Sequence, residues 1–461
     1  MYKRQPMTHQ LTMIEYAIEH GILPFYCEAG TGKTQPVVNA FTSLKKYNRV
    51  KHCLIICPKS VIETGWVGEI TKNSDHTYTV VEGTKKKKLK LLFDTDTDFY
   101  IINYEAVLSF EDKKTKKMLG DWNKFDMVIL DESQRINNYI TAKTSRLIVK
   151  LFSKRDIVKG ILSGTPIDKN PLGFWAQFEF LDPTIFNIGS WYAFRNRYAV
   201  IEDAYGSHGV YKKIVRFQNM DELKSIIAAN TIQYKKSECL DLPPKVYTTR
   251  MLEMSTELSR QYNEMKKELV LFFSETEFIS AANALVKIIR LQQIISGSYV
   301  ELKDNNKLKE VIEIIENSDE SIIIWCRFIE SINMLMANIK EPVSLLYGAT
   351  KDRAEQIELF QNKTNRIFIG QIQTGGLGIT LTAGTHVIYY ENTFKLGDRL
   401  QSEDRAHRKG QDNKVLYTDL IYKDTIDINI INSIRTKQDI ADSVLDCFTG
   451  TKVNYKRDVK K

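Results

Sequence analysis

Residues 27–34, Cys-Glu-Ala-Gly-Thr-Gly-Lys-Thr, have the residue types and spacing that a phosphate-binding loop requires. Gly30 and Gly32 let the backbone turn tightly, so that its N–H groups can approach an anion closely. Lys33 offers a positive charge to the β- and γ-phosphates, and the Thr34 hydroxyl can hold Mg²⁺. A helix that begins near Lys33 would direct the positive end of its dipole at the same phosphates. The full Gly-Lys-Thr ending disfavours a glycine-rich loop without a phosphate role, so the segment predicts a nucleoside triphosphate site.

Residues 127–134, Met-Val-Ile-Leu-Asp-Glu-Ser-Gln, are an apolar strand that ends in two acids. Strand ends and phosphate loops meet at one edge of a parallel sheet, so we expect Asp131 to reach the Mg²⁺ ion. Glu132 is expected to polarise the attacking water as a general base. Two adjacent acids are common by chance, but in this order after a phosphate loop they predict triphosphate hydrolysis.

Residues 401–411, Gln-Ser-Glu-Asp-Arg-Ala-His-Arg-Lys-Gly-Gln, carry two arginines, Arg405 and Arg408. Residues three apart share one face of a helix, and we expect this of the two arginines. Arginine is always charged and binds in a bidentate manner, which suits the charge that develops on a transferring γ-phosphoryl group. Arginines on exposed helices are ordinary, so this role requires two domains that close on one nucleotide.

The side chains named above must be positioned by regular secondary structure, and the sequence contains short apolar runs that alternate with helical segments. This pattern is typical of a parallel sheet covered by helices, and it occurs in both halves of the chain. We therefore predict the α/β class, with two doubly wound parallel-sheet domains in tandem. The runs are residues 53–57, 99–102, 127–130 and 161–162 in the first half, and 322–326, 344–346, 367–369, 387–390 and 416–421 in the second.

The predicted boundary between the two domains lies at residues 241–245, Asp-Leu-Pro-Pro-Lys, which should break any regular element. We place an N-terminal domain at residues 1–240, with a helical and hairpin insert at about 170–240. The C-terminal domain is placed at residues 241–461, with a helical insert at about 255–300.

A β-hairpin is predicted inside the first insert, with strands at 198–203 and 210–217 joined by a turn that contains two glycines. Tyr205 and His208 would stand at its tip, and Lys212 and Lys213 would give it a basic side. A solvated hairpin is one interpretation, and a pin pressed against a nucleic-acid junction is the other.

The composition sets limits on partners and compartment. The 461 residues are 43% hydrophobic and carry a net charge of +8, which is compatible with nucleic acid, although lysine runs such as 85–88 are usually solvated. Six cysteines without a C-x-x-C pair indicate reduced thiols. No apolar stretch is long enough to span a bilayer, and the N-terminus lacks a signal-peptide core. We expect a soluble, cytoplasmic protein with no membrane partner.

Taken in order, the segments resemble helicase superfamily 2 and, within it, the Snf2 family of DNA-dependent ATPase motors. The resemblance runs from about residue 5 to residue 445. Departures are Cys27, where the helicase loop has Ala, Ser133-Gln134 in the acidic segment, and Thr393-Phe394, where Trp-Asn-Pro is typical. The matching segments are residues 6–10, 27–34, 57–60 with Trp66 and Glu69, 101–105, 131–134, 162–167 with 174–175, 242–245, 290–294, 324–328, 373–382 and 401–411.

The resemblance implies two RecA-like domains that use ATP and Mg²⁺ and hold DNA by backbone contacts independent of sequence. For the DNA contacts, a loop-packing role is the alternative. The implied ATP-binding residues are Gln10, Gly30, Thr31, Gly32, Lys33, Thr34 and Gly378, and the Mg²⁺ ligands are Thr34 and Asp131. The implied coupling residues are Gln134, Ser163, Thr165 and Gln401, and the implied DNA contacts are Lys59, Ser60, Asn103, Tyr104, Thr374 and Gly376.

The segments at 290–294 and 403–408 look most like the fork-remodelling, annealing branch of the family, and the compact length resembles phage-encoded branch-migration helicases. We therefore expect a monomeric, ATP-driven translocase that remodels duplex and branched DNA by branch migration or fork regression, in a bacterium or a phage-infected host. A strand-separating superfamily 2 helicase is the nearest alternative. A nucleotide-dependent binding switch or assembly subunit is another, although a pure switch has little need for Glu132 as a base.

Overall fold

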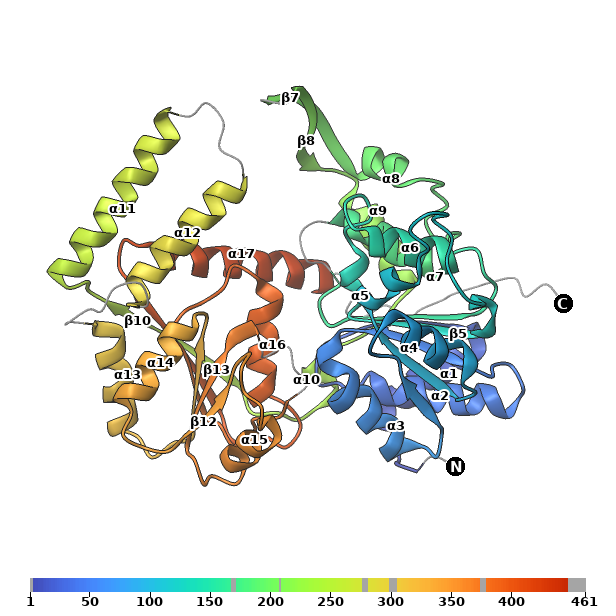
Figure 1. The fold of residues 1–461 in the computed structure, drawn as a ribbon, viewed down its shortest axis with the longest axis horizontal. Helices are drawn as coiled ribbons and strands as arrows, with labels where there is room; N and C mark the ends of the chain where they lie inside the picture. The colour runs from blue at the N-terminus through green and yellow to red at the C-terminus, as the bar shows by residue number, and fades with distance from the viewer. Residues whose placement is uncertain are drawn as a thin grey trace. The chain divides into compact units, whose positions relative to one another are not determined.

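The computed structural model describes residues 3–166, 171–206, 209–275, 281–297, 305–373 and 379–446. The chain divides into two compact units, and the main division falls between Leu240 and Asp241. The first unit holds Met1–Ala204, Lys212–Leu240 and Ala441–Lys461, and the second holds Tyr205–Tyr211 and Asp241–Ile440. Each unit is built around one parallel β-sheet (Figure 1).

The sheet of the first unit has seven strands, and every neighbouring pair is parallel. Its central strands are mostly apolar because a parallel sheet is covered on both faces, and all five residues of Cys53–Cys57 are buried. In spatial order the strands are β3 (Tyr78–Val80), β4 (Phe99–Asn103), β2 (Cys53–Cys57), β5 (Met127–Asp131), β6 (Val158–Leu162), β1 (Ile22–Cys27) and β9 (Ile232–Tyr234).

Two groups of helices cover the faces of this sheet (Figure 1). The first group packs side by side and consists of α1 (Thr8–His20), α2 (Thr34–Lys46) and α3 (Gly68–Asn73). The second group consists of α4 (Lys85–Leu89), α5 (Tyr104–Val107), α6 (Lys143–Phe152) and α7 (Phe174–Leu181). Helices on both faces are the mark of a doubly wound sheet.

The predicted hairpin is present as a separate two-stranded sheet of β7 (Ala199–Gly206) and β8 (Gly209–Phe217). It is flanked by α8 (Trp191–Tyr198) and α9 (Met220–Ala229), which are joined where Arg197 and the Tyr198 hydroxyl both bond to Glu222. After α9 the chain returns to the main sheet as β9 and continues into α10 (Lys236–Cys239). The segment predicted as an insert therefore supplies one strand of the core sheet.

The sheet of the second unit has six strands, again all parallel. Along β11, Ile322 and Ile324 pack with α13 and α14, whereas Ile323 and Trp325 pack with α15 and α16. This alternation buries both faces. The strands in spatial order are β10 (Lys245–Leu252), β15 (Val415–Tyr422), β14 (His386–Tyr389), β11 (Ile322–Cys326), β13 (Ile367–Gln371) and β12 (Val343–Leu346), and the helices are α13 (Asn306–Glu316), α14 (Ile329–Asn338), α15 (Arg353–Gln361) and α16 (Leu396–Ala406).

Three further helices of this part of the chain share an apolar cluster. They are α11 (Thr256–Glu275), α12 (Ala281–Ser296) and α17 (Ile426–Asp446). Tyr262 of α11, Ile295 of α12 and Ile430 of α17 are all buried in this cluster. The segment predicted to be helical at about 255–300 contains α11 and α12.

The α/β fold class, with two doubly wound parallel sheets in tandem and a hairpin insert, is confirmed. All nine strands predicted for the two main sheets, and both strands of the hairpin, are present within a few residues of their predicted bounds. Sequence patterning missed β1, which contains Pro24, and the three strands β3, β9 and β10, which lie at sheet edges. Edge strands need no continuous apolar run, and β10 leaves much of its length exposed.

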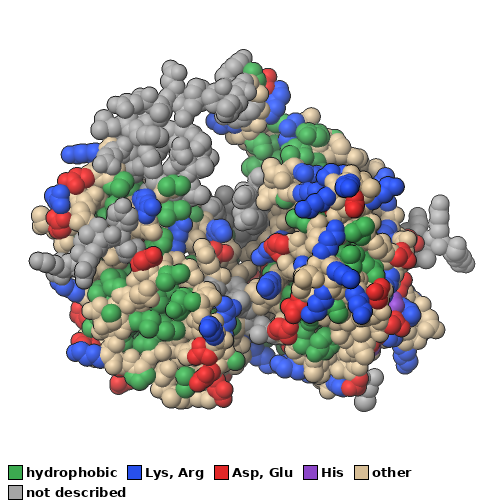
Figure 2. Space-filling view, viewed as in Figure 1, with side chains coloured by type: hydrophobic (Ala, Val, Ile, Leu, Met, Phe, Trp, Pro, Cys, Tyr) green, Lys and Arg blue, Asp and Glu red, His purple; other side chains and the backbone are tan. Residues whose placement is uncertain are grey.

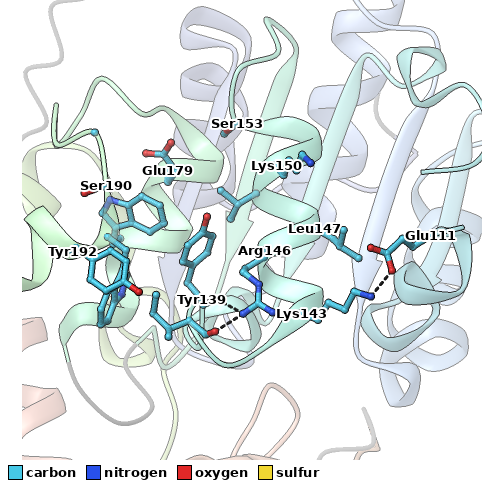
Figure 3. A pocket seen from close by; sticks show the side chains of 15 residues that line it. Glu111, Tyr139, Lys143, Arg146, Leu147, Lys150, Ser153, Glu179, Ser190 and Tyr192 are labelled. Atoms are coloured by element: carbon cyan, nitrogen blue, oxygen red, sulfur yellow. Dashed lines mark hydrogen bonds and ion pairs between the residues drawn. The ribbon is translucent and has the colours of Figure 1, made fainter. Parts of the chain in front are cut away.

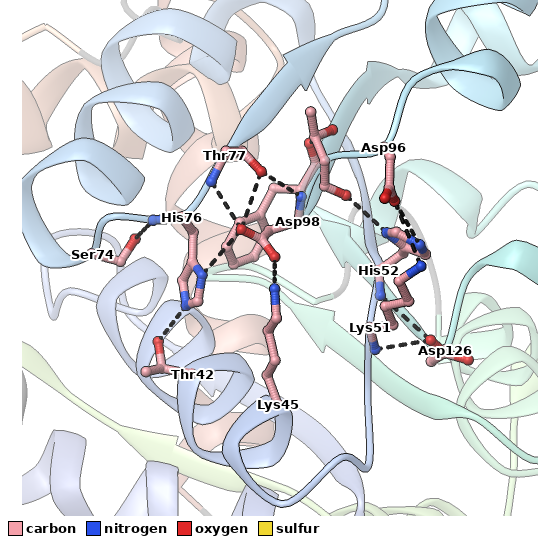
Figure 4. Close-up of polar contacts among 12 residues, drawn as sticks. Thr42, Lys45, Lys51, His52, Ser74, His76, Thr77, Asp96, Asp98 and Asp126 are labelled. Carbon is pink, nitrogen blue, oxygen red and sulfur yellow. Dashed lines mark hydrogen bonds and ion pairs between the residues drawn. The ribbon is translucent and has the colours of Figure 1, made fainter.

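A cluster of polar contacts surrounds Asp98, next to the start of β4 (Figure 4). Asp98 forms an ion pair with Lys45 of α2, accepts bonds from the Thr77 amide at 2.9 Å and hydroxyl at 3.1 Å, and lies 3.3 Å from His76. Burial alone would raise the pKa of Asp98, but the bonds from Lys45 and Thr77 hold it below its ordinary value. The cluster ties α2 to the edge of the sheet, and thereby supports the helix that the phosphate loop leads into.

Among the described residues, no helix combines the length and the apolar character needed to cross a lipid bilayer. Cysteines 27, 53, 57, 239 and 326 are free thiols.

Candidate nucleotide-binding site

The phosphate loop connects the end of β1 at Cys27 to the start of α2 at Thr34, with Lys33 as the residue that precedes the helix. Gly30 and Gly32 have φ angles of 89° and 80°, which side chains other than glycine rarely adopt. A Cβ atom on Gly32 would lie 2.5 Å from the Gln10 side-chain nitrogen. The loop therefore has the turn and the helix start that phosphate binding requires.

Lys33 lies folded against its own loop. Its ammonium group donates to the backbone oxygens of Cys27 at 2.7 Å and Glu28 at 3.2 Å, and the Thr31 hydroxyl donates to Glu28 O at 2.8 Å. The positive charge is thus held inside the loop, near the first amides of α2. This arrangement fits an anionic ligand such as the phosphates of ATP.

Helix α1 fixes the other side of the loop through Gln10, which is almost fully buried. The Gln10 amide nitrogen donates to Gly32 O at 3.0 Å, and its oxygen accepts from Met7 N at 2.9 Å. A ring nitrogen of His9 lies 2.9 Å from Thr31 O. The structure thus gives Gln10 a role in holding the loop, while the implied contact of Gln10 with ATP stays a prediction.

The two acids lie at the same edge of the sheet as the loop, because β1, β6 and β5 are consecutive parallel strands. Asp131 is the last residue of β5, and its carboxylate accepts from Trp66 Nε1 at 2.9 Å and from Glu132 N at 3.0 Å. Glu132 follows in the left-handed backbone region, with φ 51° and ψ 53°. Such a conformation is uncommon outside glycine and is concentrated at functional sites.

Burial and, to a smaller extent, the neighbouring Glu132 raise the pKa of Asp131 to about 6, although the bond from Trp66 and the charge of Lys33 act in the opposite direction. The charge of Lys33 and the bond from Trp66 therefore do not fully offset the effects of burial and of Glu132 on this carboxylate. A hard divalent cation with a preference for oxygen ligands would balance it. Asp131 and the Thr34 hydroxyl at the start of α2 therefore fit Mg²⁺ as ligands.

Asp131→Asn should raise the thermal stability of the protein at pH 7.5 by several degrees. An acid whose pKa is higher in the folded chain binds more protons when folded, so stability falls as the pH rises from the ordinary aspartate pKa of 3.8 to the folded-state pKa of about 6. Asparagine removes the charge and with it this loss. Thermal unfolding at pH 4.5 and 7.5 tests the prediction, with Asp94→Asn at an exposed position as control. A variant less stable than the wild type at pH 7.5 would contradict it.

A chain of hydrogen bonds links Glu132 to the segment after β6. Gln134 Nε2 donates to Glu132 Oε2 at 2.7 Å, the Ser163 hydroxyl donates to Gln134 Oε1 at 2.7 Å, and Thr165 N donates to Ser163 Oγ at 3.0 Å. A Cβ on Gly164 would lie 3.0 Å from Ala29 N in the phosphate loop. Three of the predicted coupling residues thus form one network beside the loop.

The arginines of the second unit differ from the expectation in one respect. Helix α16 ends at Ala406, so Arg405 is helical but Arg408 lies in the bend that follows. The predicted shared helix face is therefore wrong. Arg408 Nη1 instead donates to Ile379 O at 3.2 Å, and Arg405 O accepts from Leu381 N at 2.9 Å, so both lie beside the segment that follows residue 378. Gln401 lies within α16.

Sequence analysis missed a buried charged cluster that positions α16. Arg399 bonds to Glu403 on the same helix at 2.8 Å and pairs with Asp419 of β15, and Lys245 of β10 pairs with Glu403 at 2.9 Å. Burial alone would raise the pKa of Glu403, but Lys245 and Arg399 hold it at about 2. The i, i+4 spacing of Arg399 and Glu403 was visible in the sequence, but exposed helices carry the same pattern.

Comparison with known proteins identifies the family. A model of the SNF2-related domain matches residues 15–300, and a model of the helicase conserved C-terminal domain matches residues 306–410. The chain belongs to the SNF2-related family. The phosphate loop and both acids lie within the SNF2-related match, and Arg405 and Arg408 lie within the C-terminal match.

Curated relatives of this SNF2-related chain carry helicase names. It is 27% identical to the putative ATP-dependent helicase/translocase YwqA of Bacillus subtilis, over 91% of this chain and 46% of the relative. It is 25% identical to the uncharacterized ATP-dependent helicase MG018 of Mycoplasma genitalium (91% and 40%) and to the bovine DNA annealing helicase and endonuclease ZRANB3 (91% and 38%). The chain spans less than half the length of these relatives.

Among solved structures, the Sulfolobus solfataricus SWI2/SNF2 ATPase core in complex with dsDNA matches with 23% sequence identity and a TM-score of 0.43, covering 97% of this chain and 94% of that chain. The matches to the SNF2-related and helicase C-terminal domain models agree with the predicted family, and the curated relatives YwqA and MG018 are named as ATP-dependent helicases, which is the enzyme class predicted for this chain.

Three of the residues predicted to contact DNA lie at or just after the ends of two neighbouring strands of the first sheet. Lys59 and Ser60 follow β2, Asn103 ends the neighbouring β4, and Cys57 is paired with Asn103 across the ladder. Lys59 is exposed, and Asn103 Nδ2 donates to Glu105 at 2.8 Å. These three residues therefore remain candidates.

Tyr104 has a different role from the one predicted. Its side chain is buried, with 3% of its surface exposed, and its hydroxyl donates to the backbone oxygen of Asp131 at 2.8 Å. A phenol in this position supports the acidic segment and cannot reach a DNA backbone, so the structure removes Tyr104 from the side-chain contacts. Thr374, Gly376 and Gly378 lie outside the described residues.

The predicted pin is described only in part. Lys212 and Lys213 lie on β8, and Lys212 pairs with Asp203 of β7 at 2.5 Å, which offsets part of the basic side. Tyr205 lies on β7 near the turn, and His208 lies outside the described residues.

Proposed function

We propose that this chain is an ATP-driven DNA translocase that remodels branched DNA by branch migration or fork regression. The observation that carries the proposal is the network that joins the acids beside the phosphate loop to Ser163 and Thr165 through Gln134. Such a network offers a physical route by which the state of the nucleotide changes the segment after β6. The relative named as a DNA annealing helicase supports the choice of branched DNA.

In the proposed reaction, Lys33 and the amides at the start of α2 bind the phosphates, and Thr34 and Asp131 hold Mg²⁺. The ion supplies positive charge to the developing negative charge of the transferred phosphoryl group. Glu132 orients the attacking water and accepts its proton. Arg405 and Arg408 stabilise the same charge from the C-terminal domain.

We further propose Lys59, Ser60, Asn103, Thr374 and Gly376 as contacts to the DNA backbone. A motor that moves along DNA must not depend on base identity, and phosphate contacts carry no sequence information. Lys59 supports this assignment for the first domain, because it is exposed and follows Cys57, which pairs with Asn103 in the ladder, by two residues.

We assign the two motor domains to residues 1–240 and 241–461, and the compact units on either side of Leu240 support this boundary. We propose that the chain works as a monomer, since one chain carries both sets of motifs. The free thiols of the described cysteines suit a reducing compartment such as the cytoplasm of a bacterium or a phage-infected host.

The proposal is tested by measuring ATPase rates with single-stranded, linear duplex, forked and four-way-junction DNA. We expect stimulation by duplex DNA and stronger stimulation by the branched substrates, together with branch migration of a mobile four-way junction. Unwinding of a plain duplex in a displaced-strand assay would instead favour the strand-separating helicase. ATP turnover that no DNA stimulates would overturn the motor.

The hairpin is proposed as the element that contacts the junction. Tyr205→Ala with His208→Ala should slow branch migration while leaving duplex-stimulated ATPase activity unchanged, because the ATP site lies on other elements. Lys212→Gln with Lys213→Gln tests the basic side in the same assay. Normal branch migration in both double variants would show that the hairpin is not a pin.

A further inference from the structure

A groove of about 580 Å³ lies on the first unit, outside every segment assigned to ATP or DNA above. It is bounded by α6, by α7 and by the start of α8 (Figure 3). Figure 3 shows Tyr139 and Tyr192 on one side and Lys143 with Glu111 on the other. One wall is aromatic and the other is basic, and this combination has no role in the proposed ATPase cycle.

The aromatic wall presents rings to solvent. Tyr192 is 58% exposed, and its ring lies perpendicular to that of Trp191 with centroids 5.4 Å apart. The Arg195 guanidinium lies 5.5 Å from the Trp191 ring and 5.4 Å from the Tyr192 ring. Behind them, Tyr139 packs edge-on against Trp175 at 4.6 Å. Exposed rings of this size, held by neighbouring rings and a guanidinium, offer flat surfaces for stacking.

The basic wall is one face of α6. Lys143, Arg146 and Lys150 are three and four residues apart, so they project from the same side of the helix. The Arg146 guanidinium is fixed by a bond to Ile140 O, while Lys150 is exposed, and within the described part of the chain no carboxylate is paired with it. The wall therefore carries three positive charges in a row along the groove.

Two acids also line the groove, and each faces cations of its own. Glu111 pairs with Lys143. Glu179 is influenced by Lys154 and Lys159, although burial raises its pKa. The groove therefore keeps a positive balance, and a lysine-rich segment at 113–117 follows Glu111 in the chain. Figure 2 shows Lys and Arg side chains gathered over the helices of the first unit.

We propose that this groove binds an unpaired DNA strand, with its bases stacked on Tyr192 and Trp191 and its phosphates along Lys143, Arg146 and Lys150. Rings next to cations are the usual means of holding single strands without sequence preference. A duplex keeps its bases stacked inside, so exposed rings would contribute little to duplex binding. The inference deepens the proposed function, because a junction that is being remodelled exposes unpaired strand next to duplex.

The test compares two double variants of matched chemistry. Lys150→Gln/Tyr192→Ala changes the groove, and Lys46→Gln/Tyr47→Ala makes the same changes at exposed positions at the end of α2 and just after it, where Tyr47 is 68% exposed. Anisotropy of a labelled oligothymidylate should show about tenfold weaker binding for the groove variant and no change for the control. Loss of one cation should also reduce the slope of log K against log salt by about 0.7. Duplex-stimulated ATPase activity should stay at the wild-type rate in both.

Crosslinking of oligonucleotides that contain 4-thiothymidine, followed by peptide mapping, locates the bound strand independently. Crosslinks on the peptides of α6 and α8 are expected. Unchanged oligothymidylate affinity in the groove variant, or crosslinks confined to other elements, would overturn the inference while leaving the motor intact. Binding of a polyglutamate peptide without any single-strand binding would reassign the groove to an acidic protein partner and also overturn it. Absence of DNA-stimulated turnover in the wild-type protein would instead refute the proposed function.

Discussion

We expect Glu132→Gln to slow DNA-stimulated ATP hydrolysis by about 10²- to 10⁴-fold while leaving ATP binding unchanged. The range is what a positioned general base contributes to proton transfer. Glutamine has nearly the same shape and can still accept the bond from Gln134, so the network to Ser163 should persist. What it lacks is the ability to take a proton from water.

The backbone conformation at Glu132 sets the direction of its carboxylate, so an adjacent residue could not easily take over its role. Its φ of 51° turns the chain sharply after β5, so that Asp131 and Glu132 diverge although they are adjacent. A left-handed conformation is unfavourable for a non-glycine residue by about 1–2 kcal/mol. The network through Gln134 helps to hold it, and the direction of the Glu132 carboxylate follows from both.

Steady-state ATPase rates with saturating duplex DNA measure the effect, and equilibrium binding of a fluorescent ATP analogue measures affinity separately. Glu82→Gln, at an exposed position, controls for loss of charge. A kcat within threefold of the wild type would show that Glu132 is not the base. Weaker binding of the ATP analogue to the variant would show that the Glu132 carboxylate already contributes to binding of the nucleotide before hydrolysis.

Gly32→Ala should weaken ATP binding by at least a factor of about 5–30. The φ of 80° at Gly32 costs a side-chain residue about 1–2 kcal/mol, which corresponds to that factor if the loop is to keep its shape. The added Cβ would also lie 2.5 Å from the Gln10 amide nitrogen. Either the loop or Gln10 must move, and the bond from Gln10 to Gly32 O would be lost.

Two further variants separate these causes. Gly348→Ala adds a methyl group where no atom lies within 4 Å and should leave ATP binding unchanged. Gln10→Ala in combination with Gly32→Ala removes the clash but keeps the backbone strain, so we expect partial recovery compared with Gly32→Ala alone. Full affinity in the single Gly32→Ala variant would contradict the loop geometry described here.

The residues that bear the chemistry could be predicted from sequence because their signals are local. A phosphate loop needs glycine at turns with positive φ and a lysine before a helix. Residues 30–34 meet both requirements within five consecutive positions. Asp131 and Glu132 follow an apolar strand directly, so a doubly wound sheet brings them to the edge where the loop lies. The central strands could also be predicted from the sequence, because a strand that is buried on both faces requires a nearly continuous apolar run.

Features that depend on distant parts of the chain were decided by tertiary structure. Strand β1 forms although it contains Pro24, because it pairs with the neighbouring strand β6. A proline in a segment argues against a central strand, so the sequence did not predict β1. Tyr104 looked available for DNA, but it is buried and bonds to Asp131, 27 residues away. Arg408 looked helical, but α16 ends two residues before it.

The aromatic and basic groove and the Arg399 cluster belong to the same class. Lys143 and Tyr192 are almost fifty positions apart, and only the packing of α6, α7 and α8 makes them walls of one groove. In the sequence, nothing distinguishes Arg399, Asp419 and Lys245 from ordinary surface charges. The pairing of β10 with β15 brings Lys245 and Asp419 to the buried side of α16. Sequence alone determined which side chains this protein brings to its chemistry, since short-range geometry governs those motifs. Long-range packing decided which charges are buried and which surfaces remain exposed to solvent, because these depend on contacts between residues that lie far apart in the sequence.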